Sequence, residues 1–115
     1  MNFTIYHNPR CKKSRETLQI LRDEGIDPEV VEYLKTPLDT KELSGLCTKL
    51  NINPNQLLRK SEKIYKENFG KKELSDSEAI QAMVDFPKLM ERPVVVSGNK
   101  AVVGRPPENV KDLLL

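Results

Sequence analysis

The segment FTIYHNPRCKKSRETLQILRDEG, residues 3–25, contains the pattern that decides the fold. Its alternating, strand-favouring start predicts a strand over 2–6, which ends at an HNP turn signal. Leucines at helical spacing, followed by Gly25 as a C-cap, predict a helix over about 11–24. The next apolar segment, PEVVEYL (28–34), is rich in β-branched residues and predicts a second strand. The chain therefore opens as a βαβ unit.

This βαβ opening places a cysteine where ligands commonly bind. Such crossovers are right-handed and join parallel strands, so Cys11 should lie where the first strand ends and the helix begins. Open α/β sheets bind their ligands at this carboxyl edge. The stretch YHNPRCKKSRETL (6–18) is therefore the candidate functional segment.

The middle of the chain is predicted to be helical. Asp39 and Glu42 have capping-box spacing, and the apolar residues that follow at helical intervals make Cys47 a core residue. These apolar residues are Leu43, Leu46, Cys47 and Leu50. A short helix is expected after Pro54, and residues 61–68 are polar enough to form either a solvated helix or a loop.

The last third of the chain returns to strands. A second capping box at Ser75 and Glu78 predicts a helix that Pro87 closes. Two β-branched runs within 93–103 flank the turn SGNK and predict a hairpin, and the tail over 107–115 suits a last helix. The order β, α, β, helices, β, β, α is that of a thioredoxin-like α/β fold with a helical insertion between its halves.

Length and composition limit the class of protein. The 115 residues suit one domain, which we expect to span 1–115 with the helical insertion at about 37–90. Nineteen basic and seventeen acidic residues leave a formal charge of +2, which argues against a nucleic-acid binder. No apolar run approaches the roughly 18 residues of a membrane span, and no signal-type segment follows Met1.

The cysteine count bounds the chemistry further. Two cysteines and one histidine are too few ligands for a normal structural zinc site, so we expect no metal. Unpaired thiols without a signal segment fit a reducing, cytoplasmic setting.

Cys11 has four cationic neighbours in sequence, Arg10, Lys12, Lys13 and Arg15. The thiolate is the nucleophilic form of cysteine, and a thiol pKa of about 8.5 falls to roughly 3.5–7.5 at a helix N-terminus or beside cations. Both conditions hold for this cysteine, whereas a buried core cysteine would rarely have four charged neighbours. We therefore expect Cys11 to be a reactive nucleophile.

The residue three places after Cys11 is Ser14, so no local second thiol can resolve a mixed disulfide. An external thiol is therefore required. The Ser14 hydroxyl either donates a hydrogen bond to the thiolate or is a polar group of an exposed first turn. A cysteine phosphatase loop, C-x-x-x-x-x-R, would need arginine where this chain has Thr17, which argues against that class.

One histidine and three arginines complete the candidate site. A protonated His7 would lower the pKa of Cys11, but His7 also suits an exposed turn. Arg92 and Arg105 stand at the ends of the hairpin strands, where the expected fold brings them near Cys11, and guanidinium forks match tetrahedral oxyanions. Arg59, after the short middle helix, is the third candidate. Each arginine could also be a solvated surface charge.

Four segments together resemble the glutaredoxin-coupled arsenate reductases, an ArsC-like family with the thioredoxin fold. They are YHNPRCKKSRETL (6–18), LLRK (57–60), LMERPVVV (89–96) and GRPPE (104–108). Their order and spacing match that family over nearly the whole chain. The resemblance implies that Cys11 attacks arsenate, that glutathione reduces the thiol–arsenic adduct, and that a glutaredoxin removes the resulting mixed disulfide as arsenite leaves.

The same resemblance implies a role for each site residue. It makes Arg59, Arg92 and Arg105 the anion-binding arginines, His7 and Ser14 the groups that lower the pKa of Cys11, and Pro93 a cis-proline. It implies no bound cofactor or metal, with glutathione as a reducing co-substrate and glutaredoxin as a protein partner. Nucleic acid and membrane are not expected partners, and we expect a monomer.

One departure and two branches of the family keep alternatives open. Lys12 and Lys13 stand where the best-known arsenate reductases carry glycine and threonine, and a looser branch of the family keeps the cysteine and arginines with another substrate. A further branch comprises redox-sensing transcription regulators that bind RNA polymerase. Those generally carry C-x-x-C and lack the complete arginine set, so Ser14 and the three arginines favour an enzyme over a redox-sensing module that docks on a protein.

Overall fold

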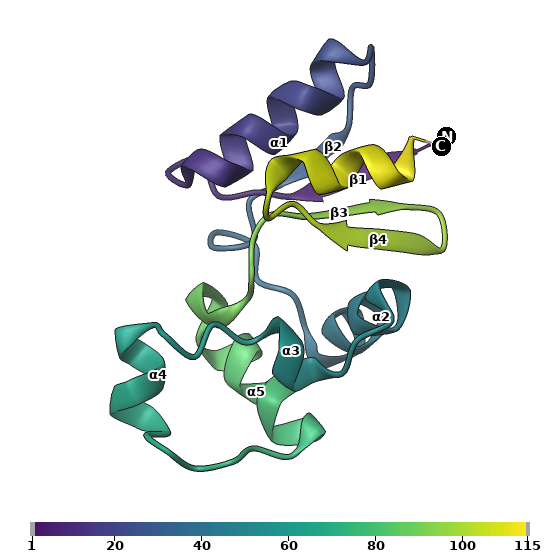
Figure 1. Cartoon of the computed structure of the whole chain (residues 1–115). Helices are drawn as coiled ribbons and strands as arrows, with labels where there is room; N and C mark the ends of the chain where they lie inside the picture. The colour runs from purple at the N-terminus through teal and green to yellow at the C-terminus, as the bar shows by residue number, and fades with distance from the viewer. Residues whose placement is uncertain (1, 115) are drawn as a thin grey trace. The chain divides into compact units, whose positions relative to one another are not determined.

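The computed structural model describes residues 2–114, which form a four-stranded sheet and a set of helices (Figure 1). The chain divides into two compact units: one contains the residues up to Thr36 together with those from Arg92 onward, and the other is Pro37–Glu91. The first unit contains β1 (Phe3–Tyr6), α1 (Lys12–Asp23), β2 (Glu29–Val31), β3 (Val94–Ser97), β4 (Lys100–Val103) and the 3₁₀-helix η2 (Pro107–Leu113). The second contains α2 (Thr40–Leu50), α3 (Pro54–Leu57), α4 (Lys63–Asn68), α5 (Asp76–Asp85) and the 3₁₀-helix η1 (Pro87–Leu89).

The sheet of the first unit has the strand order β2-β1-β3-β4. β1 runs parallel to β2, with Ile5 opposite Val30, as the βαβ prediction requires. β3 pairs antiparallel with both β1 and β4, so that Val95 lies between Ile5 and Val102. A βαβ half and a ββ-helix half with helices inserted between them constitute the expected thioredoxin-like fold, which is confirmed.

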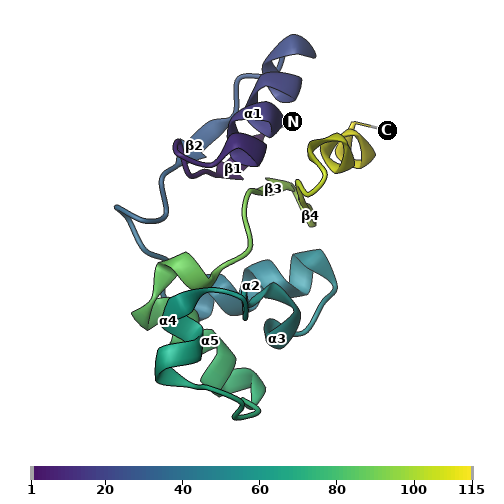
Figure 2. The same cartoon turned by 60° about the vertical axis from the view of Figure 1, so that its left-hand side comes forward.

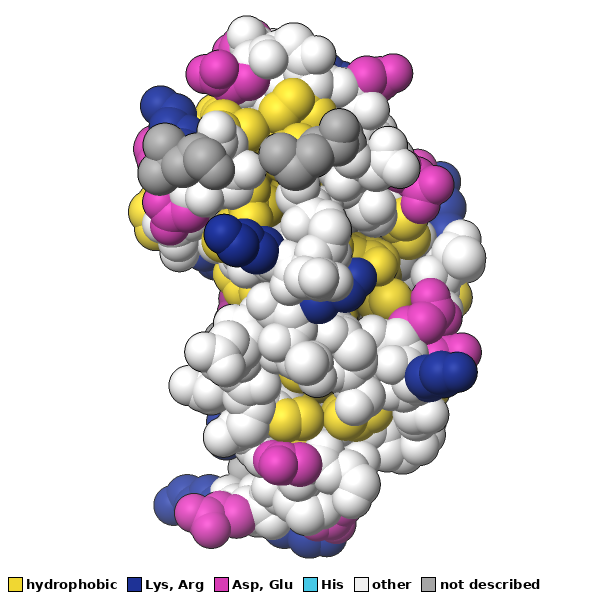
Figure 3. All heavy atoms as spheres, turned by 90° about the vertical axis from the view of Figure 1, so that its right-hand side faces the viewer, with side chains coloured by type: hydrophobic (Ala, Val, Ile, Leu, Met, Phe, Trp, Pro, Cys, Tyr) yellow, Lys and Arg dark blue, Asp and Glu magenta, His cyan; other side chains and the backbone are white. Residues whose placement is uncertain are grey.

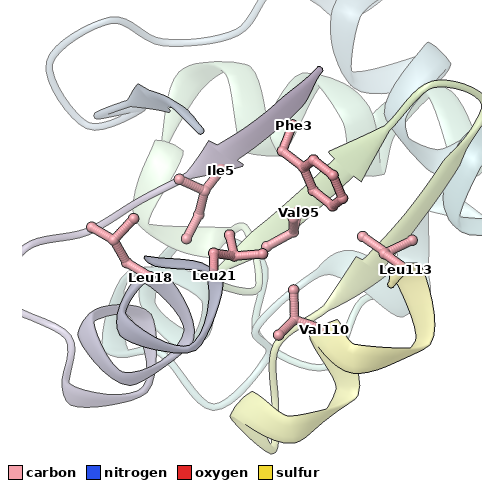
Figure 4. Packing of buried hydrophobic residues seen from close by; sticks show 7 residues of the cluster. All are labelled: Phe3, Ile5, Leu18, Leu21, Val95, Val110 and Leu113. Atoms are coloured by element: carbon pink, nitrogen blue, oxygen red, sulfur yellow. The ribbon is translucent and has the colours of Figure 1, made fainter. Parts of the chain in front are cut away.

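The core of the first unit lies between one face of the sheet and two helices. α1 and η2 lie side by side over that face (Figure 2). The buried side chains shown in Figure 4 come from β1, β3, α1 and η2: Phe3, Ile5, Leu18, Leu21, Val95, Val110 and Leu113. Each such side chain contributes about 1.5–3 kcal/mol by leaving water, so this cluster holds α1 and η2 against the sheet.

Two predicted elements differ from the structure at their ends. The second strand was expected over 28–34 but ends at Val31, because the Glu32 carbonyl accepts hydrogen bonds from the N–H groups of Lys35 and Thr36 and begins a turn. The last helix was expected over 107–115 and is a 3₁₀-helix ending at Leu113. Its final predicted residue, Leu115, lies outside the described residues.

The helical unit follows its sequence signals closely. Both capping boxes form: Asp39 Oδ1 accepts from the N–H of Glu42 at 2.8 Å, and Ser75 Oγ accepts from the N–H of Glu78 at 3.2 Å. Residues 63–68 form α4, so the helical alternative for the polar segment is the correct one. Cys47 is buried on α2, as the core pattern predicted, and burial, with a smaller contribution from Asp76, raises the pKa of its thiol.

Charged side chains of both signs are intermixed on the face drawn in Figure 3, with apolar groups between them. None of the helices within residues 2–114 is long and apolar enough to cross a membrane. Within the same residues, no cluster of three or more His, Cys, Asp or Glu side chains is placed to hold a metal ion.

Candidate active site around Cys11

Cys11 is the N-cap of α1, with the extended backbone angles φ −91° and ψ 121°. The preceding turn forms because the Asn8 carbonyl accepts from the N–H of Cys11 at 3.0 Å and the Asn8 side chain accepts from the N–H of Arg10 at 3.0 Å. The carbonyl of Cys11 then accepts the first helical hydrogen bond, from Arg15. The half-buried sulfur therefore lies at the positive end of the helix dipole.

Several groups act on the Cys11 thiol. Partial burial alone would raise its pKa, but hydrogen bonds from the Ser14 N–H, the Arg92 guanidinium and the Lys13 N–H, together with the charge of Arg92, outweigh burial and lower the pKa. A lowered pKa increases the thiolate fraction at neutral pH, and the thiolate is the form that attacks electrophiles. The helix start and one arginine are thus the main causes.

Ser14 is fully buried, so the alternative of an exposed first-turn serine is wrong. Its hydroxyl oxygen accepts a hydrogen bond from the N–H of Asn8 at 3.1 Å and lies 2.6 Å from Nδ1 of His7. The hydrogen bond from Ser14 to Cys11 comes from the backbone N–H. Ser14 therefore ties the turn before α1 to the helix itself.

His7 is buried with 6% of its surface exposed, so the alternative of an exposed turn histidine is also wrong. Its backbone N–H donates to the carbonyl of Val31 at 2.8 Å, which extends the β1–β2 pairing by one residue. Burial lowers the pKa of His7; Glu32 opposes this shift, while Arg22 and Arg15 add to it. The ring is therefore mainly neutral at pH 7, and His7 contributes little positive charge near Cys11 at that pH.

Arg92 and Arg105 are neighbours at one end of the hairpin. Arg92 precedes β3 and Arg105 follows β4, and the peptide bonds Arg92–Pro93 and Arg105–Pro106 are both cis. Nη1 of Arg105 donates to the carbonyl of Arg92 at 3.5 Å, and the guanidinium of Arg92 donates to Cys11. The hairpin therefore brings Arg92 to the thiol and Arg105 beside Arg92.

Arg59 belongs to the second unit. Its N–H donates to the carbonyl of Leu89 at 2.7 Å, and its guanidinium pairs with Glu62 at 3.3 Å and Glu91 at 3.8 Å. The side chain is only 16% exposed, so the alternative of a solvated surface charge does not describe it. Its placement at the thiol stays a prediction.

Sequence reasoning missed the contribution of Asn8. This residue shapes the turn before α1 through its carbonyl, its side chain and its N–H, which reach Cys11, Arg10 and Ser14. The signal was available, because Asn before Pro is a strong turn initiator that bonds its own following backbone. The two acidic partners of Arg59 were missed as well, although Glu62 lies at a helical ion-pair spacing.

Comparison with known proteins adds three results. The chain matches the ArsC family over residues 6–113. It is 54% identical over 112 residues to the protein YfgD of Escherichia coli (strain K12), covering 96% of this chain and 94% of that protein. It is 41% identical over 116 residues to an arsenate reductase of Haemophilus influenzae, covering 99% of this chain and all of that protein.

Solved structures agree with these sequence relatives. An arsenate reductase from Vibrio cholerae superposes with a TM-score of 0.92 at 46% identity and covers 97% of both chains. The two chains therefore share their fold along almost their whole length.

Proposed function

The chain belongs to the ArsC family, and from this premise we propose that it is an arsenate reductase with Cys11 as the nucleophile. The observation that carries the proposal is the half-exposed Cys11 thiol, which lies at the start of α1 and accepts a hydrogen bond from Arg92. A thiolate beside a guanidinium is suited to attack a small anion, because the cation attracts the anion and keeps the sulfur ionised.

The first proposed step forms a bond between sulfur and arsenic. Arg92 and Arg105 hold the arsenate oxygens in two-point fashion, and the Cys11 thiolate attacks the arsenic atom. An S–As bond forms, and one oxygen takes up protons and leaves as water. Guanidinium groups already in place at the site stabilise the negative charge that this step gathers on the remaining oxygens.

The second proposed step is the reduction, for which glutathione supplies the electrons. Its thiolate attacks the Cys11 sulfur, an S–S bond forms, the S–As bond breaks, and its electron pair reduces As(V) to As(III), which leaves as arsenite. A glutaredoxin thiolate then takes the glutathione from the mixed disulfide and restores Cys11. Ser14 supports the use of an external thiol, because a serine three residues after Cys11 cannot resolve the disulfide as a second cysteine would.

The other predicted site residues have supporting roles in this proposal. Ser14 and His7 hold the turn before α1 through their contact, so that the N–H groups of the first helical turn face the sulfur. Arg59 is the third oxyanion-binding arginine, and Glu62 and Glu91 orient its guanidinium. Free thiols and a glutathione-dependent cycle suit the cytoplasm, and one chain acting as a single domain suffices for the reaction.

Turnover of arsenate in the presence of glutathione, glutaredoxin and its reductase tests the proposal. We expect wild-type protein to produce arsenite and Cys11→Ser to produce none. Cys47→Ser is the matched control: this buried residue of α2 has a raised pKa, so its loss should leave turnover intact. Full activity of Cys11→Ser would refute the assignment. Turnover of another oxyanion, but not of arsenate, would place the chain in the looser branch of the family.

A further inference from the structure

Strand β4 is followed by a glycine that is needed for close packing. Gly104 is buried, and a Cβ atom at this position would lie 2.6 Å from Oγ1 of Thr17 and 2.9 Å from Cγ of Pro93. Real Cβ atoms essentially never approach another heavy atom so closely, and a packed interior has no free volume to absorb the clash. Any side chain at 104 must therefore move α1, Pro93 or the end of β4.

Thr17 is the helical side of this contact. It is fully buried in the second turn of α1. Its hydroxyl donates to the carbonyl of Lys13 at 2.8 Å and lies 3.4 Å from the carbonyl of Gly104. The first bond is local to the helix, as is common for threonine, whereas the second joins α1 to a chain segment 87 residues away.

The two arginines extend outward from the same contact. Gly104 donates its N–H to the carbonyl of Pro93 at 2.8 Å, which closes the β3–β4 pair. Arg92 and Arg105 are the next residues beyond this pair, and Arg105 donates to the Arg92 carbonyl at 3.5 Å. The Pro93–Gly104 pair that packs against Thr17 is therefore joined directly to both arginines.

We propose that Gly104 and Thr17 are positioning residues, whose direct contact holds Arg92 against the sulfur of Cys11 and Arg105 beside it. Neither residue touches the sulfur; both act through the arginines. A hydrogen bond weakens steeply with misalignment, so an outward shift of the bonded Pro93–Gly104 pair would deprive the thiolate of its guanidinium partner while the sheet persists. For arsenate turnover, the inference rests on the proposed function.

The test is the pH dependence of Cys11 alkylation by iodoacetamide. It is measured in a Cys47→Ser background, so that all alkylation occurs at Cys11. We expect Gly104→Ala to raise the thiol pKa by about 1 unit, the lower end of the effect of a nearby opposite charge. We also expect kcat/KM for arsenate to fall by about tenfold or more, as for other misplaced binding groups. An unchanged thiol pKa in folded Gly104→Ala would overturn the inference.

Two controls separate positioning from general damage. Gly45→Ala makes the same change on α2, where a Cβ meets nothing within 4 Å, and should leave the thiol pKa unchanged. Leu46→Ala removes a buried side chain of α2 and should lower the melting temperature without moving the thiol pKa. A rise of the thiol pKa in Leu46→Ala as large as in Gly104→Ala would assign the effect to lost stability and overturn the positioning role.

A second variant examines the contact from the helix. In Gly104→Ala/Thr17→Ala, the two Thr17 atoms nearest to the added methyl are gone, so the thiol pKa should return part of the way to the wild-type value. No recovery would count against the contact. Where Gly104→Ala does not fold, Thr17→Ala alone should raise the thiol pKa by loosening β4 from α1, and an unchanged value would overturn the inference.

The titration requires no arsenate, so the two proposals can fail separately. If the wild-type protein does not reduce arsenate, the proposed function is refuted. The thiol titration remains a valid test of positioning in that case. Normal turnover with an unmoved thiol pKa in Gly104→Ala removes the positioning role and leaves the proposed function in place.

Discussion

Nδ1 of His7 lies 2.6 Å from Oγ of Ser14, and both side chains are buried. This contact joins the residue after β1 to the first turn of α1 and spans the turn that carries Cys11. The Ser14 hydroxyl also accepts from the N–H of Asn8, so three parts of the turn meet at one oxygen. The position of the turn that carries the sulfur therefore depends on this buried contact.

Ser14→Ala should destabilise the fold and disturb the thiol. The change leaves the His7 ring and the Asn8 N–H without their partner, which costs about 1–3 kcal/mol for a buried polar group. The alkylation pKa of Cys11 should rise as the turn loosens. Urea unfolding and the alkylation profile measure the two effects. Wild-type stability in Ser14→Ala would show that the contact does not hold the turn.

The lowered pKa of His7 predicts a stability loss in mild acid. The folded state resists protonation of His7. As the pH falls below 6.5, the ordinary pKa of histidine, the unfolded state therefore binds more protons than the folded state. The contribution of His7 to the free energy of unfolding should therefore be fully present above pH 6.5. It should decrease as the pH falls from there to the lowered pKa of His7 in the folded state. Unfolding curves at several pH values measure this slope.

His7→Asn is the matched variant for this pH dependence, since its amide keeps a polar group near Ser14 and does not titrate. The difference in unfolding free energy between wild type and His7→Asn should shrink as the pH falls through this range. A difference independent of pH would mean that His7 does not titrate with a lowered pKa.

Arg92→Ala should act on the thiol and on the oxyanion together. The alkylation pKa of Cys11 should rise because a hydrogen bond and a positive charge are lost. The loss in kcat/KM for arsenate should correspond to about 2–4 kcal/mol, as for other removed oxyanion donors. Arg92→Lys restores charge without the planar fork, so it should recover more of the thiol pKa than of the turnover. Equal recovery of both would contradict two-point binding.

Lys12 and Lys13 are exposed beside Cys11 and should recruit an anionic thiol. Replacing both by glutamine should reduce kcat/KM for glutathione several-fold at low salt and weaken its salt dependence, because exposed charges act through a screened field. Turnover supported by a neutral thiol such as 2-mercaptoethanol should change little. Lys41→Gln, an exposed change on α2, is the control. An equal loss with both thiols would refute recruitment by charge.

Local sequence signals predicted most of the fold. The βαβ opening, both capping boxes, the hairpin and the buried Cys47 depend on residues within a few positions of each other, where propensity and periodicity act directly. The predicted end of β2 was wrong because a turn at Glu32 follows Val31, and the last helix is a 3₁₀-helix that ends at Leu113. Neither feature has a strong signal in a short window.

The candidate site divides along the same line. By itself the sequence determined that a thiol without a C-x-x-C partner begins a helix and has cationic neighbours, and it predicted an external reductant, since each of these follows from residue type and spacing. Only the tertiary structure decided that His7 is buried and mainly neutral, that Arg92 reaches Cys11, and that Gly104 packs against Thr17. The physical reason is that burial and long-range contact arise from packing segments distant in the chain, and no local pattern encodes how closely those segments approach.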